Sequence, residues 1–144
     1  MSVVKFKEDY KFWVDKERDI GEMLEQKGYI IWEAHKTTDI HDISFSKWKN
    51  LYSWEIKSRR NTKDQYEDTM IGANKLEEAW WRYYKEWVET IFFFIFTDWI
   101  YFLRPFECIP RIEYKAGRWD RGAIDRKKGW AYFATASLIN IMDI

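Results

Sequence analysis

The sequence predicts one mixed α/β domain in which a central mixed β-sheet is flanked by helices. Segments 9–27 and 73–87 repeat apolar side chains at helical spacing. Segment 42–57 alternates apolar and polar residues, as two paired strands do. Segment 90–97 is apolar almost throughout, which is typical of a strand buried on both faces at the centre of a sheet.

Composition limits the class of protein. The 144 residues suit a single domain, 1–144, and 47% apolar content argues against disorder. The single cysteine, Cys108, excludes an internal disulfide framework and a multi-cysteine zinc site, and fits a reducing compartment. The N-terminus has no run of signal-peptide length, and the apolar run 91–96 is too short to span a bilayer. We therefore expect a cytoplasmic protein.

Charge is balanced overall but unevenly distributed. A formal net charge of zero argues against binding to nucleic acid through a uniformly basic surface. Lysine and arginine nevertheless concentrate in 47–63 and 111–128, whereas 64–89 leans acidic. Local basic surfaces of this kind suit phosphate binding.

The first predicted helix, 9–27, carries a carboxylate on its apolar stripe. Trp13, Ile20 and Leu24 lie on one face at helical spacing, and Gly28 is placed to end the helix. Glu17 falls on the same stripe. A carboxylate on a buried face is costly without a partner, so Glu17 is a candidate for a functional role.

A short strand, 29–34, precedes the predicted hairpin 42–57. One face of the hairpin is apolar and the other is polar, and the polar face holds Asp42, Ser44, Ser53, Glu55 and Lys57. A two-residue turn at Lys49-Asn50 would place Asp42 opposite Lys57 and Ser44 opposite Glu55. The Cβ atoms of Asp42 and Glu55 would then lie about 7–8 Å apart as diagonal neighbours.

Two carboxylates at that separation can share one divalent cation, and Mg²⁺ prefers oxygen ligands. Lys57 would lie beside the ion, where it can contact a phosphate. Asp39 is an alternative first ligand. On an uninterrupted strand Asp39 points to the other face, so Asp42 is preferred, but a bulge would reverse that choice. His35 and His41 fit no nucleophile or zinc pattern.

Segment 58–69 is polar and predicts a loop after Lys57, so Arg59, Arg60 and Lys63 would leave the strand end near bound phosphate. The second helix, 73–87, has an apolar stripe that we expect to pack into the core, with Lys75 off that stripe; its members are Ala73, Leu76, Trp80, Tyr84 and Trp87.

The remaining chain predicts shorter elements. Strands are expected at 100–106, interrupted by Pro105, at 111–115 as an edge strand, and at 130–134. A basic, glycine-containing loop is expected at 116–129, and Ser137 is placed to cap a short final helix at 138–142.

Asp42, followed about a dozen residues later by Glu55-Ile56-Lys57, resembles the motif of the PD-(D/E)XK nuclease superfamily. His41 stands where that family often has proline. The element order over about 9–106 is similar to the α-β-β-β-α-β core of the restriction-endonuclease-like fold, with the remaining tail as an extension. By this resemblance Asp42 and Glu55 bind metal with the Ile56 carbonyl, Lys57 is catalytic, Glu17 completes the site, and the second helix contributes Lys75.

The resemblance implies a Mg²⁺- or Mn²⁺-dependent nuclease that hydrolyses phosphodiester bonds in DNA. Arg59, Arg60 and Lys63 would hold the backbone. The spacing of helix and hairpin is similar to that of archaeal-type Holliday junction resolvases, which favours a structure-specific endonuclease. The compact, aromatic-rich chain suggests a phage or viral origin. Cutting two strands would call for a homodimer. The alternatives are a nuclease acting on RNA and a non-catalytic module that binds nucleic acid or protein.

Overall fold

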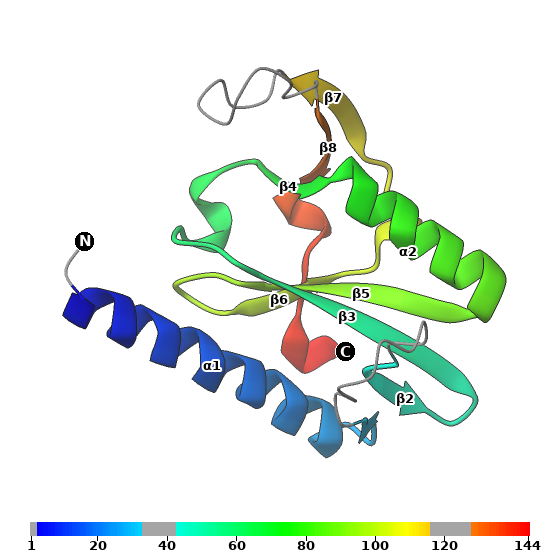
Figure 1. Cartoon of the computed structure of the whole chain (residues 1–144), viewed down its shortest axis with the longest axis horizontal. Coiled ribbons are helices and arrows are strands. Elements are labelled where there is room, and N and C mark those ends of the chain that lie inside the picture. Colours follow the sequence, from blue (N-terminus) through cyan, green and yellow to red (C-terminus); the bar gives the residue numbers. More distant parts are fainter. Residues whose placement is uncertain (1–2, 33–42, 116–127) are drawn as a thin grey trace.

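The computed structural model describes residues 3–32, 43–115 and 128–144. Helices α1 (Val3–Gln26) and α2 (Ala73–Glu86) lie on opposite faces of a central sheet (Figure 1). In spatial order that sheet contains β1 (Ile30–Ile31), β2 (Phe45–Lys47), β3 (Asn50–Ser58), β5 (Val88–Ile95), β6 (Ile100–Leu103) and β9 (Ile139–Asn140). A second sheet, on the α2 side, contains β4 (Asp68–Gly72), β8 (Lys128–Ala134) and β7 (Arg111–Lys115).

The central sheet is mixed, as predicted. Strands β3 and β5 are parallel, and every other neighbouring pair in it is antiparallel. Strand β5 is the buried centre: its residues from Thr90 to Ile95 are all buried. Both faces must therefore be apolar, which explains why the segment shows no alternation.

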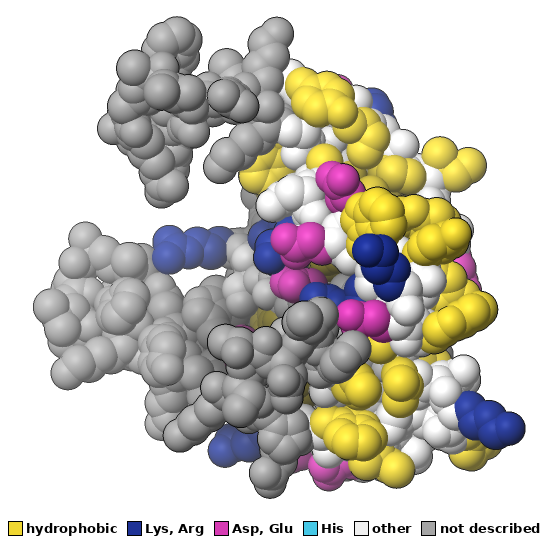
Figure 2. All heavy atoms as spheres, turned by 45° about the vertical axis from the view of Figure 1, so that its right-hand side comes forward, with side chains coloured by type: hydrophobic (Ala, Val, Ile, Leu, Met, Phe, Trp, Pro, Cys, Tyr) yellow, Lys and Arg dark blue, Asp and Glu magenta, His cyan; other side chains and the backbone are white. Residues whose placement is uncertain are grey.

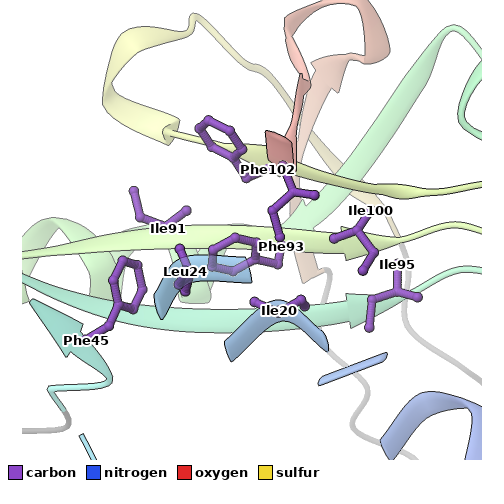
Figure 3. Close-up of a cluster of buried hydrophobic side chains, with 9 residues drawn as sticks. Ile20, Leu24, Phe45, Ile91, Phe93, Ile95, Ile100 and Phe102 are labelled. Carbon is purple, nitrogen blue, oxygen red and sulfur yellow. The ribbon is translucent and has the colours of Figure 1, made fainter. Parts of the chain in front are cut away.

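The side chains of β5 alternate between two cores. On the α1 face, Ile91, Phe93 and Ile95 pack with Ile20 and Leu24 of α1 (Figure 3). This cluster confirms the predicted apolar stripe of the first helix at Ile20 and Leu24, whereas Glu17, predicted on the same buried face, is exposed.

The second core lies between the central sheet, α2 and the second sheet. Phe92 and Phe94 of β5 pack there with Ala79 of α2 and Phe133 of β8. Strand β4 begins in the segment predicted to be a loop, because its backbone pairs with β8 along its whole length.

The core packing predicted for the apolar stripe of α2 is confirmed for Leu76, which is partly buried against the second core, but not for the larger side chains of the stripe. Ala79 is buried against the sheet, whereas Trp80, Tyr84 and Trp87 are exposed. Successive helical residues are rotated by about 100°. The stripe therefore points sideways, away from the side on which Ala79 meets the sheet.

Two other predictions are corrected by the structure. Segment 138–142 is not a helix: β9 pairs with β6, and a short 3₁₀ turn, Ile141–Asp143, follows. Pairing with β6 uses the backbone groups that a helix would need, and the Asn140 side chain accepts a hydrogen bond from the Met142 N–H. The strand predicted at 100–106 ends at Leu103, before the 3₁₀ turn Pro105–Glu107.

The hairpin turn is also displaced from its predicted position. Phe45 pairs with Tyr52 and Lys47 with Asn50, so the turn residues are Trp48 and Lys49 rather than Lys49 and Asn50. Trp48 adopts the left-handed conformation that such a turn requires, with φ 55°. The pairing register shifts by two residues, so the side chains of β3 and of the paired residues in β2 keep their predicted faces. No described helix is long and apolar enough to cross a membrane.

Candidate functional site

The polar face of β3 is directed towards α2. Tyr52, Trp54 and Ile56 pack against the core on the α1 face. Glu55 and Lys57 alternate with them and pair in register with Phe92 and Phe94, which belong to the core beneath α2. A carboxylate and an amine are thus held on the α2 face of the sheet by the period-2 geometry of one strand.

Glu55 and Lys57 are close to each other and only partly exposed. Glu55 Oε2 lies 3.8 Å from Lys57 Nζ, and the two side chains are 29% and 26% exposed. Strand β2 pairs with β3 only as far as Tyr52. Beyond that point no strand of the described residues pairs with this edge of β3, beside which Glu55 and Lys57 lie.

Arg82 of α2 contacts the polar face of β3 at Ser53. Its Nη1 donates to Ser53 Oγ at 3.1 Å and lies 3.5 Å from Thr90 Oγ1 on β5. Both hydroxyl-bearing residues are buried. One guanidinium therefore fastens α2 to the two parallel strands. The sequence signal for this contact was only that Arg82 lies off the apolar stripe of its helix.

Lys75 lies on the same polar edge of α2 as Arg82, two helical turns earlier. That is about 10 Å along the helix, which runs roughly antiparallel to β5 (Figure 1). Lys57 is about 13 Å beyond Ser53 along β3. By these rises Lys75 and Lys57 lie at similar positions along the sheet, but the Lys75 side chain pairs on its own helix, with its Nζ 3.6 Å from Glu78 Oε2.

Glu17 does not share the face of Glu55. It is exposed on α1, which covers the opposite face of the sheet (Figure 1). Any contribution of Glu17 to the polar face of β3 would have to pass around the open edge of that strand.

Asp42, the first proposed metal ligand, lies outside the described residues, as does its alternative, Asp39. Within the described ranges, which do not include Asp42, no three His, Cys, Asp or Glu side chains come together to hold a metal ion. Glu55 supplies a carboxylate and Ile56 a main-chain carbonyl. Both are oxygen donors of the kind that Mg²⁺ and Mn²⁺ accept, so the donor set fits the metals that the resemblance implies.

The strand that leads to Asp42 is irregular at Ser44. The Ser44 N–H donates to the carbonyl of Tyr52, the residue that pairs with Phe45, and Ser44 Oγ accepts from the Trp54 N–H. Two successive residues, Ser44 and Phe45, therefore lie opposite Tyr52, as in a β-bulge. The preference for Asp42 over Asp39 assumed an uninterrupted strand, so both remain candidates.

Of the three basic residues expected to hold phosphate, Arg59 instead binds other groups of the protein. Its Nη2 donates to the Met70 carbonyl at 2.9 Å, and the guanidinium lies 5.6 Å from the ring centroid of Phe94. Burial lowers the pKa of Arg59 from its usual value, although arginine remains charged near neutrality. Arg59 thus links β3 to the second sheet.

Arg60 and Lys63 follow Arg59 at the end of β3. Arg60 is exposed. Lys63 Nζ lies 3.2 Å from Asp64 Oδ1 and 5.2 Å from the ring centroid of Tyr101. Of these two cations, Arg60 is the one exposed to a backbone phosphate, because the Lys63 side chain is only 16% exposed and lies against Asp64.

Comparison with known proteins gives two matches. A family model described as "Phage putative PDDEXK endonuclease" matches residues 7–136. The match extends beyond 106, so it includes the second sheet and not only the expected core. No curated protein matches the chain.

Among solved structures, Hjc of Archaeoglobus fulgidus, a Holliday junction resolvase, is similar in fold. The TM-score is 0.53 at 10% sequence identity, over 88% of this chain and 94% of that chain. At this identity the likeness concerns the fold, which is the restriction-endonuclease-like fold expected from the sequence.

Proposed function

Because the chain belongs to the phage PDDEXK endonuclease family, we propose that it is a metal-dependent endonuclease that hydrolyses phosphodiester bonds in DNA. The observation that carries the proposal is the pairing of Glu55 with Lys57 on the polar face of β3, both partly exposed to solvent. The family motif requires these residue types at this spacing, and the fold presents both on one face.

In this proposal Asp42, with Asp39 as the alternative first ligand, and Glu55 hold Mg²⁺ or Mn²⁺ together with the Ile56 carbonyl. When bound, such an ion supplies Lewis-acid activation of the phosphate and of the attacking water. Lys57 Nζ donates a hydrogen bond to the water or to a phosphate oxygen, where it stabilises developing negative charge. Glu17 and Lys75 are proposed to complete the site from the two helices.

The basic residues at the end of β3 position the substrate. Arg60 and Lys63 contact the DNA backbone, and Arg59 contributes a fixed positive charge from within the fold. Contacts to phosphate determine position and carry no sequence information. The substrate is therefore proposed to be selected by its structure, such as a branch or junction, and cutting both strands uses two copies of the chain.

Metal binding tests the site separately from cleavage. Mn²⁺ at a hundred times its dissociation constant should stabilise the wild-type fold by about 2.7 kcal/mol, which thermal unfolding detects. Glu55→Gln should lose this stabilisation. Without metal it should unfold at the same temperature as wild type or higher, because the proposed site then has one fewer clustered carboxylate.

Lys49→Gln is the matched control, since Lys49 is exposed in the hairpin turn on the same pair of strands. It should keep the full Mn²⁺-dependent shift. If wild type shows no shift, or if Glu55→Gln keeps it, Glu55 is not a metal ligand. If Glu55→Gln fails to fold, the carboxylate has a structural role.

A further inference from the structure

The sideways stripe of α2 forms an exposed aromatic surface. Tyr84 and Trp87 are 70% and 77% exposed, and Trp80, Trp81 and Tyr83 are also exposed. At roughly 150–250 Å² for each aromatic side chain, these five leave about 400–700 Å² accessible. A patch of that size reaches or exceeds the largest apolar patch of a typical monomer, and such patches mark interaction sites.

The surface is not uniform along the helix. Its C-terminal end protrudes, because Tyr84 and Trp87 have most of their surface in solvent. Its N-terminal end is hollowed. An open hollow of about 490 Å³ lies between α2 and the segment that leads into β7, and its lining includes Ala73, Leu76, Trp80, Phe106, Ile112 and Tyr114.

We propose that this face is an interface between two copies of the chain, packed antiparallel through α2. Trp87 and Tyr84 of each copy would enter the hollow of the other. A two-fold axis near Trp80 would set the small Ala73 of one copy against the large Trp87 of the second, and Leu76 against Tyr84. In an isologous interface both copies use the same patch, so that patch must contain both the protruding side chains and the hollow that receives them. Here the two lie about 21 Å apart on one helix.

The size of the surface suits this partner. Each copy contributes about 800 Å² to a standard interface. The five aromatic side chains of α2 supply most of that area, and the exposed Phe106, Ile112 and Tyr114 add to it. Aromatic residues are also the side chains most enriched at the centres of interfaces.

The flanking charges favour a second copy over nucleic acid. The N-terminal half of α2 carries Lys75, Glu77 and Glu78, and the C-terminal half carries Arg82, Lys85 and Glu86, so the first half has a net charge of −1 and the second of +1. Lys85 Nζ lies 4.8 Å from the ring centroid of Trp81. Antiparallel packing turns the acidic half of one helix towards the Lys85 half of the other. A nucleic acid on the same face would bring phosphates against both glutamates. In Figure 2, which brings the C-terminal end of α2 forward, hydrophobic patches alternate with cationic and acidic side chains.

The test is the mass of the full-length protein in solution, measured by sedimentation velocity over a range of concentrations, for wild type and two exposed variants. Trp87→Asn removes the protruding group, and asparagine suits its left-handed backbone, φ 59°. Ile112→Arg blocks the hollow from a position on β7 that is not part of the core. Wild type should be a dimer, and each variant should weaken it at least 30-fold, the change that corresponds to a hot spot of about 2 kcal/mol.

Mixing the two variants provides a sharper result. In a mixed pair the Trp87 of the Ile112→Arg chain meets the intact hollow of the Trp87→Asn chain, so one of the two contacts returns. The mixture should therefore associate more strongly than either variant alone. Trp48→Asn is the matched control, because Trp48 is also an exposed tryptophan with positive φ but lies on the hairpin turn. It should remain a dimer.

Circular dichroism and thermal unfolding should show that every variant is folded. A wild-type monomer at all concentrations, a Trp87→Asn variant that still dimerises, or an open polymer would overturn the proposal. A monomer whose tryptophan fluorescence changes on addition of duplex DNA, and not in Trp87→Asn, would assign the surface to nucleic acid. The assembly does not depend on the nuclease chemistry. An inactive dimer would overturn the nuclease proposal alone, whereas a monomer that cuts DNA would overturn this interface and the use of two copies but not the nuclease site.

Discussion

Replacing Arg82 with methionine should destabilise the fold by about 2 kcal/mol. The bond from Arg82 Nη1 to Ser53 Oγ, at 3.1 Å, joins a charged donor to a buried hydroxyl. Hydrogen bonds to charged groups contribute about 1.5–3 kcal/mol. The contact to Thr90 Oγ1, at 3.5 Å, is at the limit of hydrogen bonding and adds little. Methionine keeps the aliphatic stem, so the change removes mainly the polar contacts.

Urea unfolding of Arg82→Met measures this loss, which corresponds to a fall in Tm of about 4–8 °C for a domain of this size. Lys85→Met is the control: it removes one positive charge from the same helix at an exposed position and should cost less than about 1 kcal/mol. Combined with Ser53→Ala in a double-mutant cycle, Arg82→Met should show a coupling of about 1–2 kcal/mol. Additive effects, or equal losses in the Arg82 and Lys85 variants, would refute the role assigned to Arg82.

Three further changes have defined outcomes. Trp48→Gly should raise stability by about 1 kcal/mol, measured by urea unfolding, because glycine adopts positive φ without the cost borne by a residue with a Cβ; a loss would mean that the Trp48 side chain stabilises the fold. Burial, assisted by the negative charge of Glu89, raises the pKa of Tyr52. The folded state favours the neutral hydroxyl of Tyr52, so its contribution to the free energy of unfolding is complete below about pH 10 and is lost as pH rises through the folded pKa. Tyr52→Phe should therefore reduce the loss of stability at alkaline pH. An unchanged pH profile would assign that loss to other groups. Replacing Arg60 and Lys63 with alanine together should weaken DNA binding and lower the slope of log affinity against log salt by about 1–2, whereas an unchanged slope would remove the end of β3 from the substrate path.

Local pattern was sufficient for the elements whose surroundings are simple. The stripe of Ile20 and Leu24 identified the face of α1 that is buried, and the unbroken apolar run around Phe93 identified the central strand. Alternation through Tyr52 and Trp54 correctly assigned the two faces of β3. In each case the period of the sequence matches the geometry of the element, and one face has an apolar neighbour.

Contacts between distant segments were not accessible in this way. The periodicity of α2 showed which aromatic residues share a face but not whether that face meets the sheet, and Trp87 proved to be exposed. Strand β4 is stabilised by its pairing with β8, far away in the sequence. The hydrogen bond from Arg59 to the Met70 carbonyl likewise depends on β4. That strand was not predicted, because it begins in a polar segment that reads as a loop.

The central claim is that Glu55 and Lys57 form the active centre of a metal-dependent DNA endonuclease. Its most direct test is cleavage of labelled single-stranded, duplex, forked and four-way-junction DNA with Mg²⁺, Mn²⁺ or EDTA, using wild type beside Lys57→Ala and Lys49→Ala. Metal-dependent cutting by wild type and Lys49→Ala that is lost in folded Lys57→Ala is the predicted result. Equal cutting by Lys57→Ala would contradict the assignment of the site. If wild type leaves every DNA intact but cuts RNA, the site is that of a ribonuclease, and if it cuts neither, the chain is a binding module.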